Sequence, residues 1–171
     1  MNLILSDRYL DINSVPHCSD INFINLSELK ITSCIGCFGC WTKTPGCCVI
    51  RDDAVRVYPL IAASRQIMYV SQIRYGCYDT VMKTMLERAI PIQQAFIRLF
   101  QGETHHLQRN VAPKKAVIIG YGNISFEEQE LFRRLVARNA KNMNFIDFNI
   151  IFAAENKVEE IVKQEMSKWE K

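Results

Sequence analysis

The sequence has none of the features that mark a membrane-spanning, exported or nucleic-acid-binding protein. No apolar stretch approaches the ~20 residues that a helix needs to cross a bilayer. The opening residues, MNLILSDRYLD, contain no cationic leader before a long apolar run, so we expect a soluble chain that is not exported. The net charge of +3 is small and the lysines and arginines are scattered, so no basic stripe indicates nucleic acid.

Internal repeats, low-complexity tracts and linkers are also missing, so we expect residues 1–171 to form one domain. The composition, 49% hydrophobic and 23% charged, is that of a globular domain with a real core. The seven cysteines are an odd number in a chain that is not small, which disfavours a secreted disulfide framework. We therefore expect a cytoplasmic protein whose thiols are free or bound to metal.

Four of the cysteines stand in one short segment, spaced C-x2-C-x2-C-x7-C, at Cys34, Cys37, Cys40 and Cys48. Thiolates are soft ligands that suit zinc or iron–sulfur clusters, and the glycines among them let the backbone curl so that several sulfurs can point inward. The segment could hold an iron–sulfur cluster or zinc, or its thiols could be unliganded and pack as small buried hydrophobes. Spacing alone does not separate these hypotheses.

Short apolar runs alternate with helical patterns, which predicts strand–helix–strand units around a mostly parallel sheet. Each run is apolar enough to be covered on both faces of that sheet. The predicted strands are Asn2 to Leu5, Ile21 to Leu26, Gln66 to Val70, Ala116 to Gly120 and Phe145 to Phe152. The predicted helices are Asp53 to Ala63, Asp79 to Phe100, Ser125 to Lys141 and Glu155 to Lys171, and Pro91 should break or kink the second.

The first connection is too short for a full crossover helix. It contains Pro16 and shows no clear apolar period. We expect either a helix of a turn or two or a plain loop, which leaves one face of the sheet thinly covered. A partner chain could cover that face.

Two segments carry a resemblance to a known family. The cysteine segment is followed by a pair of acids, and SQIRYGCYDTVMKTMLER follows the third strand. In this pattern the chain resembles the flavodoxin-like NAD(P)H-dependent FMN reductases, and most of all the iron–sulfur flavoproteins among them. The likeness covers about residues 31–88 and recurs weakly at IGYGN. Its matching positions are Cys34, Gly36, Cys37, Cys40, Trp41, Pro45, Gly46, Cys48, Asp52 and Asp53.

The resemblance implies a three-layer α/β/α fold with a five-stranded parallel sheet in the order 2-1-3-4-5. It also implies an FMN whose ring lies between the loops after the third and fourth strands, and an iron–sulfur cluster on the cysteine segment. The implied FMN-binding residues are Ser71, Gln72, Ile73, Arg74, Tyr75 and Gly76 after the third strand, Gly120, Tyr121, Gly122 and Asn123 after the fourth, and Ser6 and Arg8 after the first. Either Tyr75 or Tyr78 is expected near the face of the ring.

The phosphate-binding loop departs from the family. Relatives carry a Gly-Ser-Pro-Arg type loop and a long helix there, whereas this chain has Ser6, Asp7 and Arg8. A carboxylate near a phosphate opposes binding, although Arg8 could offset it. We predict an FMN-dependent oxidoreductase that passes electrons from a reduced nicotinamide or a protein donor. The alternative is a degenerate module that has lost FMN and serves in protein association, metal binding or thiol sensing.

Several other residues have a structural interpretation that we favour. Asp52 and Asp53 are expected to cap a helix rather than act as acid and base. Trp41 is expected in the core, and His105 and His106 in a solvated polar loop. The apolar residues of the long helix could form a homodimer face or pack within the chain; they are Met82, Met85, Leu86, Ile90, Ile92, Ala95, Phe96 and Leu99.

Overall fold

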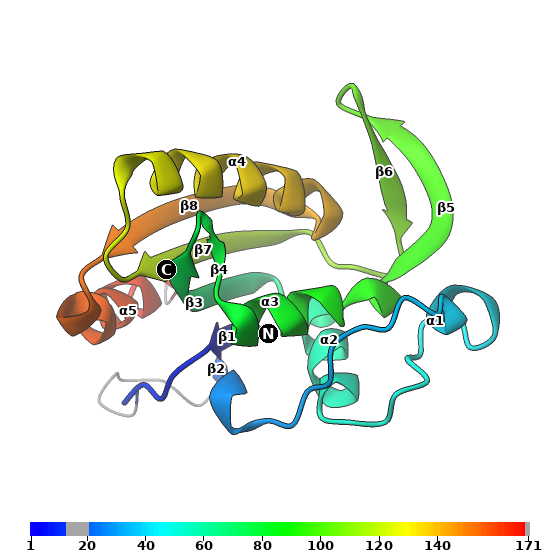
Figure 1. The fold of residues 1–171 in the computed structure, drawn as a ribbon, viewed down its shortest axis with the longest axis horizontal. Helices are drawn as coiled ribbons and strands as arrows, with labels where there is room; N and C mark the ends of the chain where they lie inside the picture. Colours follow the sequence, from blue (N-terminus) through cyan, green and yellow to red (C-terminus); the bar gives the residue numbers. More distant parts are fainter. Residues whose placement is uncertain (13–20, 170–171) are drawn as a thin grey trace.

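A parallel sheet runs through the centre of the computed structural model, which describes residues 1–12 and 21–169 (Figure 1). The strands are hydrogen-bonded in the order β2-β1-β3-β7-β8, and each neighbouring pair is parallel. They are β1 (Asn2–Ser6), β2 (Ile21–Asn25), β3 (Gln66–Arg74), β7 (Lys114–Tyr121) and β8 (Phe145–Ala153). Counted along the chain this is the order 2-1-3-4-5, so the predicted flavodoxin-like α/β fold is confirmed.

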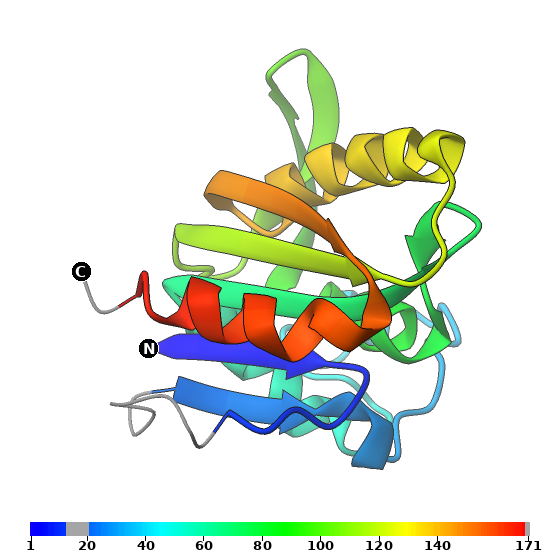
Figure 2. The same cartoon turned by 90° about the vertical axis from the view of Figure 1, so that its left-hand side faces the viewer.

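Helices cover the two faces of this sheet unequally. The helices α2 (Ala54–Ala63), α3 (Thr80–Glu87) and α4 (Phe126–Asn142) pack on one face, and α5 (Val158–Met166) packs on the other (Figure 2). The sheet therefore has one hydrophobic core under α2, α3 and α4 and another under α5. Successive side chains of a strand point to opposite faces, so Leu3 and Leu5 of β1 belong to the first of these cores and Ile4 to the second. All three are 0% exposed.

The segment after β1 has no helix in the part that the structure describes. Residues 7–12 form no regular element, and residues 13–20 lie outside the described part. Leu10 and Ile12 pack into the core beside α5, where a crossover helix would otherwise lie. The first crossover is therefore shortened as far as it is described.

The short elements complete the chain. They are η2 (Leu26–Glu28), α1 (Gly39–Thr42), β4 (Cys77–Tyr78), η3 (Ile90–Ile92) and η4 (Glu155–Lys157). The predicted helix from Glu155 to Lys171 is thus a single 3-10 turn followed by α5, and its last two residues lie outside the described part. Within the described ranges, no helix is long and apolar enough to span a bilayer.

The start of α4 agrees with its predicted position. Ser125 Oγ accepts a hydrogen bond from the Glu128 backbone N–H at 3.2 Å, and a Glu128 carboxylate oxygen accepts one from the Ser125 N–H at 3.0 Å. This reciprocal pair satisfies two of the N–H groups that a helix leaves without partners at its N-terminus. Carboxylates at Glu127 and Glu128 also favour the positive end of the helix dipole.

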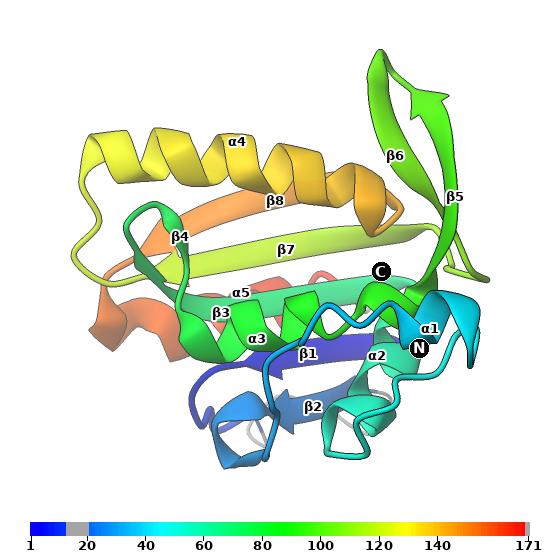
Figure 3. The same ribbon diagram turned by 45° about the vertical axis from the view of Figure 1, so that its right-hand side comes forward.

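The prediction of a long helix from Asp79 to Phe100 was wrong. Helix α3 ends at Glu87, and a 3-10 turn containing Pro91 leads into an antiparallel hairpin of β5 (Gln93–Phe100) and β6 (Glu103–Gln108). Proline has no N–H and blocks a continuing helix. Gln101 and Gly102 then turn the chain with φ of 50° and 79°, which fits a tight hairpin turn. The hairpin projects past the end of α4 (Figures 1 and 3).

The residues of the predicted helical apolar face therefore have different environments. Met82 and Met85 are buried in the core, as the interpretation of packing within the chain predicted. Phe96 and Leu99 instead lie on the hairpin, where they are 69% and 78% exposed.

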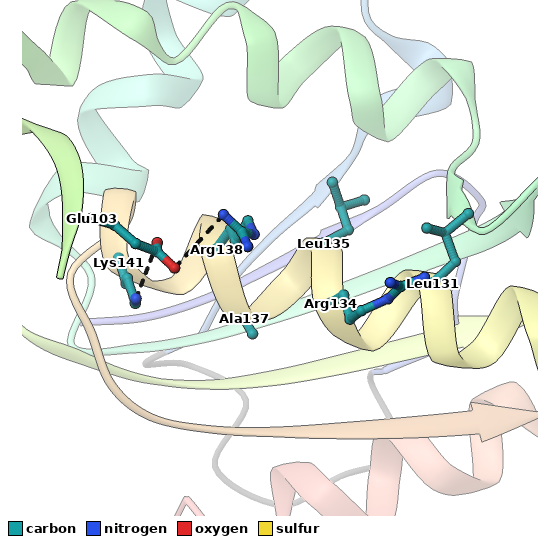
Figure 4. Close-up of a pocket in the computed structure, with 7 residues that line it drawn as sticks. All are labelled: Glu103, Leu131, Arg134, Leu135, Ala137, Arg138 and Lys141. Atoms are coloured by element: carbon teal, nitrogen blue, oxygen red, sulfur yellow. Dashed lines mark ion pairs between the residues drawn. The ribbon is translucent and has the colours of Figure 1, made fainter. Parts of the chain in front are cut away.

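Ion pairs attach this hairpin to α4. The Glu103 carboxylate lies 3.0 Å from Lys141 Nζ and 3.6 Å from an Arg138 guanidinium nitrogen (Figure 4). These groups border a surface cavity of about 450 Å³ between the hairpin and α4.

His105, predicted in a solvated loop, is instead 8% exposed on β6, with its ring nitrogens 2.8 Å from Asn142 Oδ1 and 2.9 Å from Glu103 Oε2. The polar pattern GETHHLQRN thus belongs to a strand that packs on a helix end.

The buried hydroxyl of Tyr69 lacks a hydrogen-bond partner in the described part of the chain, which gives a stability prediction. Tyr69 is 2% exposed, and its hydroxyl has no hydrogen-bond partner among the described residues. Tyr69→Phe should raise the free energy of unfolding by about 1 kcal/mol, because the cost of burying that hydroxyl is removed. Tyr58→Phe is the matched control, since the Tyr58 hydroxyl accepts a hydrogen bond from the Cys48 N–H at 3.2 Å and its loss should destabilise. Urea denaturation gives the change in the free energy of unfolding for both variants. A loss of stability in Tyr69→Phe equal to that in Tyr58→Phe would contradict the prediction.

Candidate functional site

The carboxyl ends of β1, β3 and β7 meet at one edge of the sheet, where open α/β sheets bind their ligands. This edge gathers the residues predicted after the first, third and fourth strands. The tip of the β3–β4 hairpin lies beside the first turns of α4 at the same edge (Figures 2 and 3). The sheet thus brings the three predicted binding segments together.

The Asp7 carboxylate lies at the centre of this edge. Its Oδ2 accepts a hydrogen bond from the Gln72 backbone N–H at 2.7 Å, and its Oδ1 accepts one from the Tyr121 hydroxyl at 2.7 Å. The Asp7 N–H donates to the Val70 carbonyl at 3.1 Å, which fixes the backbone that carries the carboxylate. One side chain therefore links the ends of β1, β3 and β7.

Burial affects the protonation of both partners in this contact. It raises the pKa of the Asp7 carboxyl, and the hydrogen bonds from Tyr121 and Gln72 oppose that rise only in part. The pKa of Tyr121 is raised as well, first by burial and then by its hydrogen bond to Asp7. Tyr121 therefore stays protonated at neutral pH and remains a donor.

Ser6 and Arg8 flank Asp7 in different ways. Ser6 is 0% exposed, and its Oγ accepts a hydrogen bond from the Arg8 N–H at 3.2 Å. The Arg8 guanidinium lies 5.4 Å from the centre of the Tyr121 ring and 3.2 Å from a Glu155 carboxylate oxygen. Its side chain is 34% exposed, so solvent can reach this cation.

The segment after β3 is a tight turn rather than an open loop. Ile73 pairs with Tyr78 and Arg74 with Cys77, so that Tyr75 and Gly76 alone make the turn, with φ of 53° and 69°. Three of the predicted ring-binding residues are buried: Ser71, Ile73 and Gly76. Arg74 and Tyr75 are exposed, and Tyr75 is 88% exposed at the tip. Tyr78 packs in the core, so of the two tyrosines considered for the ring only Tyr75 reaches the surface.

Gly76 gives a second stability prediction. A Cβ at this position would lie 2.6 Å from Leu131 Cδ2 and 2.9 Å from Leu131 Cβ, and the positive φ adds strain. Gly76→Ala should therefore cost about 2–3 kcal/mol, from left-handed backbone strain plus overpacking. Gly102→Ala is the control, because Gly102 has a φ of 79° but no atom within 4 Å of the added carbon. Equal losses in thermal unfolding would show that the Leu131 contact has no effect.

The segment after β7 has a buried and an exposed half. A Cβ on Gly120 would lie 2.8 Å from Ile73 Cγ1, so this glycine leaves room for the Ile73 side chain of β3. Gly122 has a φ of 125°, and an added carbon there would meet Gln72 only at ordinary contact distance, 3.7 Å. Asn123 is exposed. The surface of the site therefore consists of Gln72, Arg74, Tyr75, Gly122 and Asn123.

A bound FMN would meet a mismatch at its phosphate end. Phosphate sites in this kind of fold use helix N-termini and converging N–H and hydroxyl donors. Among residues 1–12, no helix follows β1, and the converging donors from Gln72 and Tyr121 are already bonded to Asp7. The residues of this structure thus present surface beside which a flavin ring could lie, but they do not fit its phosphate.

The cysteine segment is held by a buried ion pair. Arg88, at the end of α3, is 1% exposed and donates two hydrogen bonds to the Asp52 carboxylate, at 2.6 and 2.9 Å. It also donates to the Thr32 carbonyl at 2.6 Å and lies 3.4 Å from Cys48 Sγ. Burial alone would raise the pKa of Asp52, but the bonds from Arg88, Thr32 and Ala54 lower it below its ordinary value. Asp52 therefore anchors the loop, and it also accepts from the Ala54 N–H at the start of α2, as predicted for a cap. Asp53 stands at the N-cap position, but its side chain makes no capping bond and instead accepts from the Lys30 N–H at 2.7 Å.

The four thiols are not gathered as metal ligands in this structure. Cys34 and Cys37 are exposed, whereas Cys40 and Cys48 are partly buried. Burial and the neighbouring Cys48 thiol raise the pKa of Cys40. Nowhere in residues 1–12 or 21–169 do three His, Cys, Asp or Glu side chains form a group that could hold a metal ion. A cluster on these cysteines stays a prediction that requires the loop to rearrange.

Helix α1, which lies within the cysteine segment, and the strand-end site are at opposite ends of the sheet. Helix α1 packs beside the base of the β5–β6 hairpin, away from β4 (Figure 3). The Trp41 ring packs against that of His106 at a tilt of 41°, with ring centres 4.6 Å apart, and its indole N–H donates to the Ile90 carbonyl at 3.4 Å. Trp41 is partly buried and connects α1 to the β5–β6 hairpin. Trp41 therefore lies away from the predicted flavin.

Comparison with known proteins finds a curated sequence relative and solved structures that share the fold. No family model matches the chain. Over 72 residues it is 32% identical to the iron-sulfur flavoprotein of Archaeoglobus fulgidus, a match that covers 42% of this chain and 32% of the relative. The matched region thus spans about a third of that relative's length.

Solved structures resemble the chain over almost its whole length. An FMN-dependent NADH-azoreductase from Bacillus anthracis, solved in complex with FMN, has a TM-score of 0.58 at 12% identity and covers 98% of this chain and 95% of its own. The NAD(P)H:quinone oxidoreductase of Methanothermobacter marburgensis has a TM-score of 0.56 at 9% identity, with coverage of 98% and 96%. At this identity the likeness shows the fold. Together the relatives support the resemblance to flavodoxin-like FMN reductases that the motifs predicted.

Proposed function

We propose that this protein is a flavin-dependent oxidoreductase of the FMN reductase type. The main support is the arrangement of the strand-end edge, where exposed residues after β3 and β7 lie at the position at which sheets of this order bind flavin. The relatives, an iron-sulfur flavoprotein and FMN-dependent reductases, point to the same class of chemistry.

The residues of this edge have distinct parts in the proposal. Tyr75 offers an exposed aromatic face at the tip of the β3–β4 turn, and Gly122 leaves space beside Gln72. Arg74, whose side chain lies 3.6 Å from Asp79, adds a cation that could attract a nicotinamide phosphate. A bound isoalloxazine would supply transfer of a hydride or of single electrons, and the donor is a reduced nicotinamide or an electron-transfer protein.

Flavin binding tests the proposal. Anaerobically purified protein should quench the fluorescence of added riboflavin or FMN and show saturable binding. Tyr75→Ala should weaken binding about tenfold through the lost stacking contact. Phe96→Ala is the control, because Phe96 is also exposed but lies on the β5–β6 hairpin. The proposal fails if neither flavin binds, or if the Phe96 variant loses as much affinity as the Tyr75 variant.

The proposal includes an iron–sulfur cluster on Cys34, Cys37, Cys40 and Cys48. Its support is the thiolate donor set and the sequence similarity to an iron-sulfur flavoprotein. Iron and sulfide analysis of anaerobically prepared protein tests it, with Cys77→Ser as a control for a thiol outside the segment. Protein without iron after reconstitution would remove the cluster and leave the flavin proposal intact.

We also propose that the protein is cytoplasmic and forms a homodimer of single-domain subunits. Exposed Phe96 and Leu99 on the hairpin supply apolar surface suited to association between copies. Analytical ultracentrifugation of the wild type and of Leu99→Lys tests the assembly. A wild type that sediments as a monomer at high concentration would contradict it.

A further inference from the structure

The strand-end site contains its own anion. Two donors from different strands, the Gln72 N–H of β3 and the Tyr121 hydroxyl of β7, converge on the Asp7 carboxylate at 2.7 Å each. Two hydrogen-bond donors that point at one carboxylate favour its ionised form. The arrangement is therefore an anion-binding position that a side chain of the same chain occupies.

Neighbouring groups hold this carboxylate in place. The backbone of Asp7 bonds to Val70, and Ser6 is fully buried on one side of it. Arg8 on the other side already pairs with Glu155, whose own side chain is 68% exposed. A phosphate entering this edge would compete with Asp7 for both donors and would meet a like charge.

We propose that Asp7 is the specificity-determining residue of the strand-end site: its carboxylate occupies the anion position, so this position excludes the phosphate of FMN and the site accepts a flavin without its phosphate. The inference rests on the proposed function for the identity of the ring. The exclusion of the phosphate follows from the contacts of Asp7 alone. Shortening this side chain should convert the site into one that binds external anions.

Flavin titrations at pH 7 test the exclusion. Wild type should bind riboflavin about tenfold or more tightly than FMN, because the FMN phosphate would meet the Asp7 charge and find both donors occupied. In Asp7→Ser, and to a smaller extent in Asp7→Asn, FMN affinity should rise about tenfold while riboflavin affinity changes little. Asp147→Ser, at an exposed aspartate on β8, is the control and should behave as wild type.

A second readout needs no flavin. Inorganic phosphate should raise the thermal unfolding midpoint of Asp7→Ser, because the free donors of Gln72 and Tyr121 bind the added anion. The midpoints of wild type and of Asp147→Ser should not respond beyond the effect of matched ionic strength from chloride.

The outcomes separate the two proposals. If riboflavin binds and FMN binds equally well to wild type and Asp7→Ser, the inference about Asp7 is overturned and the flavin proposal stands. If no flavin binds to any variant, the proposed function fails, and the phosphate experiment decides the anion position by itself. A midpoint of Asp7→Ser that phosphate does not change would then overturn this inference too.

Discussion

Arg88→Met is expected to lower the free energy of unfolding by about 3–5 kcal/mol, because it leaves the Asp52 carboxylate in a largely buried site without its charge partner. Arg88 also donates to the Thr32 and Ile50 carbonyls, so the variant loses the bonds that hold both sides of the cysteine segment. Urea denaturation followed by circular dichroism gives the value. Lys83→Met, which breaks an exposed pair with Glu87, is the control and should change stability by about 0.5 kcal/mol or less.

The pH dependence of this loss identifies Asp52 as its source. The folded-state pKa of Asp52 is lowered, so its contribution is present above its unfolded pKa and disappears as the pH falls through the folded value. The gap between wild type and Arg88→Met should therefore shrink under acidic conditions. The double variant Arg88→Met with Asp52→Asn should recover part of the loss. A loss below about 1 kcal/mol at pH 7 would show that the ion pair does not hold the segment.

Lys114 is expected to produce the second largest effect, as a change of stability with pH. The residue is 0% exposed, its Nζ donates to the Ala112 and Met143 carbonyls at 2.7 and 3.2 Å, and burial lowers its pKa from 10.5 to about 8. Between these two values the unfolded chain binds more protons than the folded one, so stability rises with pH. Below pH 8 the full cost of burying the charged amine is present.

Comparison with Lys114→Met isolates the contribution of Lys114 to the pH dependence of stability. Cysteines and tyrosines titrate in the same range, but they are common to both proteins and cancel in the difference. From pH 8 to 10, wild type should gain stability over the variant by about 1 kcal/mol per pH unit. Guanidinium denaturation in a series of buffers measures the difference. A difference that does not vary with pH would mean that Lys114 keeps its ordinary pKa in the folded protein.

Local sequence patterns predicted most of the architecture. Apolar runs such as AVIIG identify buried parallel strands, because such strands are covered on both faces, and Ser125 with Glu128 identifies a helix start through a capping box. The hairpin of β5 and β6 was missed because its apolar residues also fit a helical period. The Gln-Gly pair at 101 and 102 is the sequence signal that could have located it, because glycine readily adopts the positive φ that a tight hairpin turn needs.

The strand pattern predicted which segments lie together at the strand ends but not the contacts among them, and flavin binding there stays a prediction. Strand order places residues after β1, β3 and β7 together, and the presence of Asp7 was recognised as unfavourable for a phosphate. That its carboxylate would take the Gln72 and Tyr121 donors depends on strand register, which no local pattern contains. The same holds for Arg88, whose partner Asp52 lies 36 residues away along the chain.

An NMR titration tests the central claim most directly. Uniformly 15N-labelled protein is mixed with riboflavin, and backbone amide shifts are mapped onto the structure. We expect saturable shifts at Gln72, Tyr75, Gly122 and Asn123, and unchanged signals in the cysteine segment at the other end of the sheet. Shifts confined to the β5–β6 hairpin, or no saturable shifts, would contradict a flavin site at the carboxyl ends of β3 and β7.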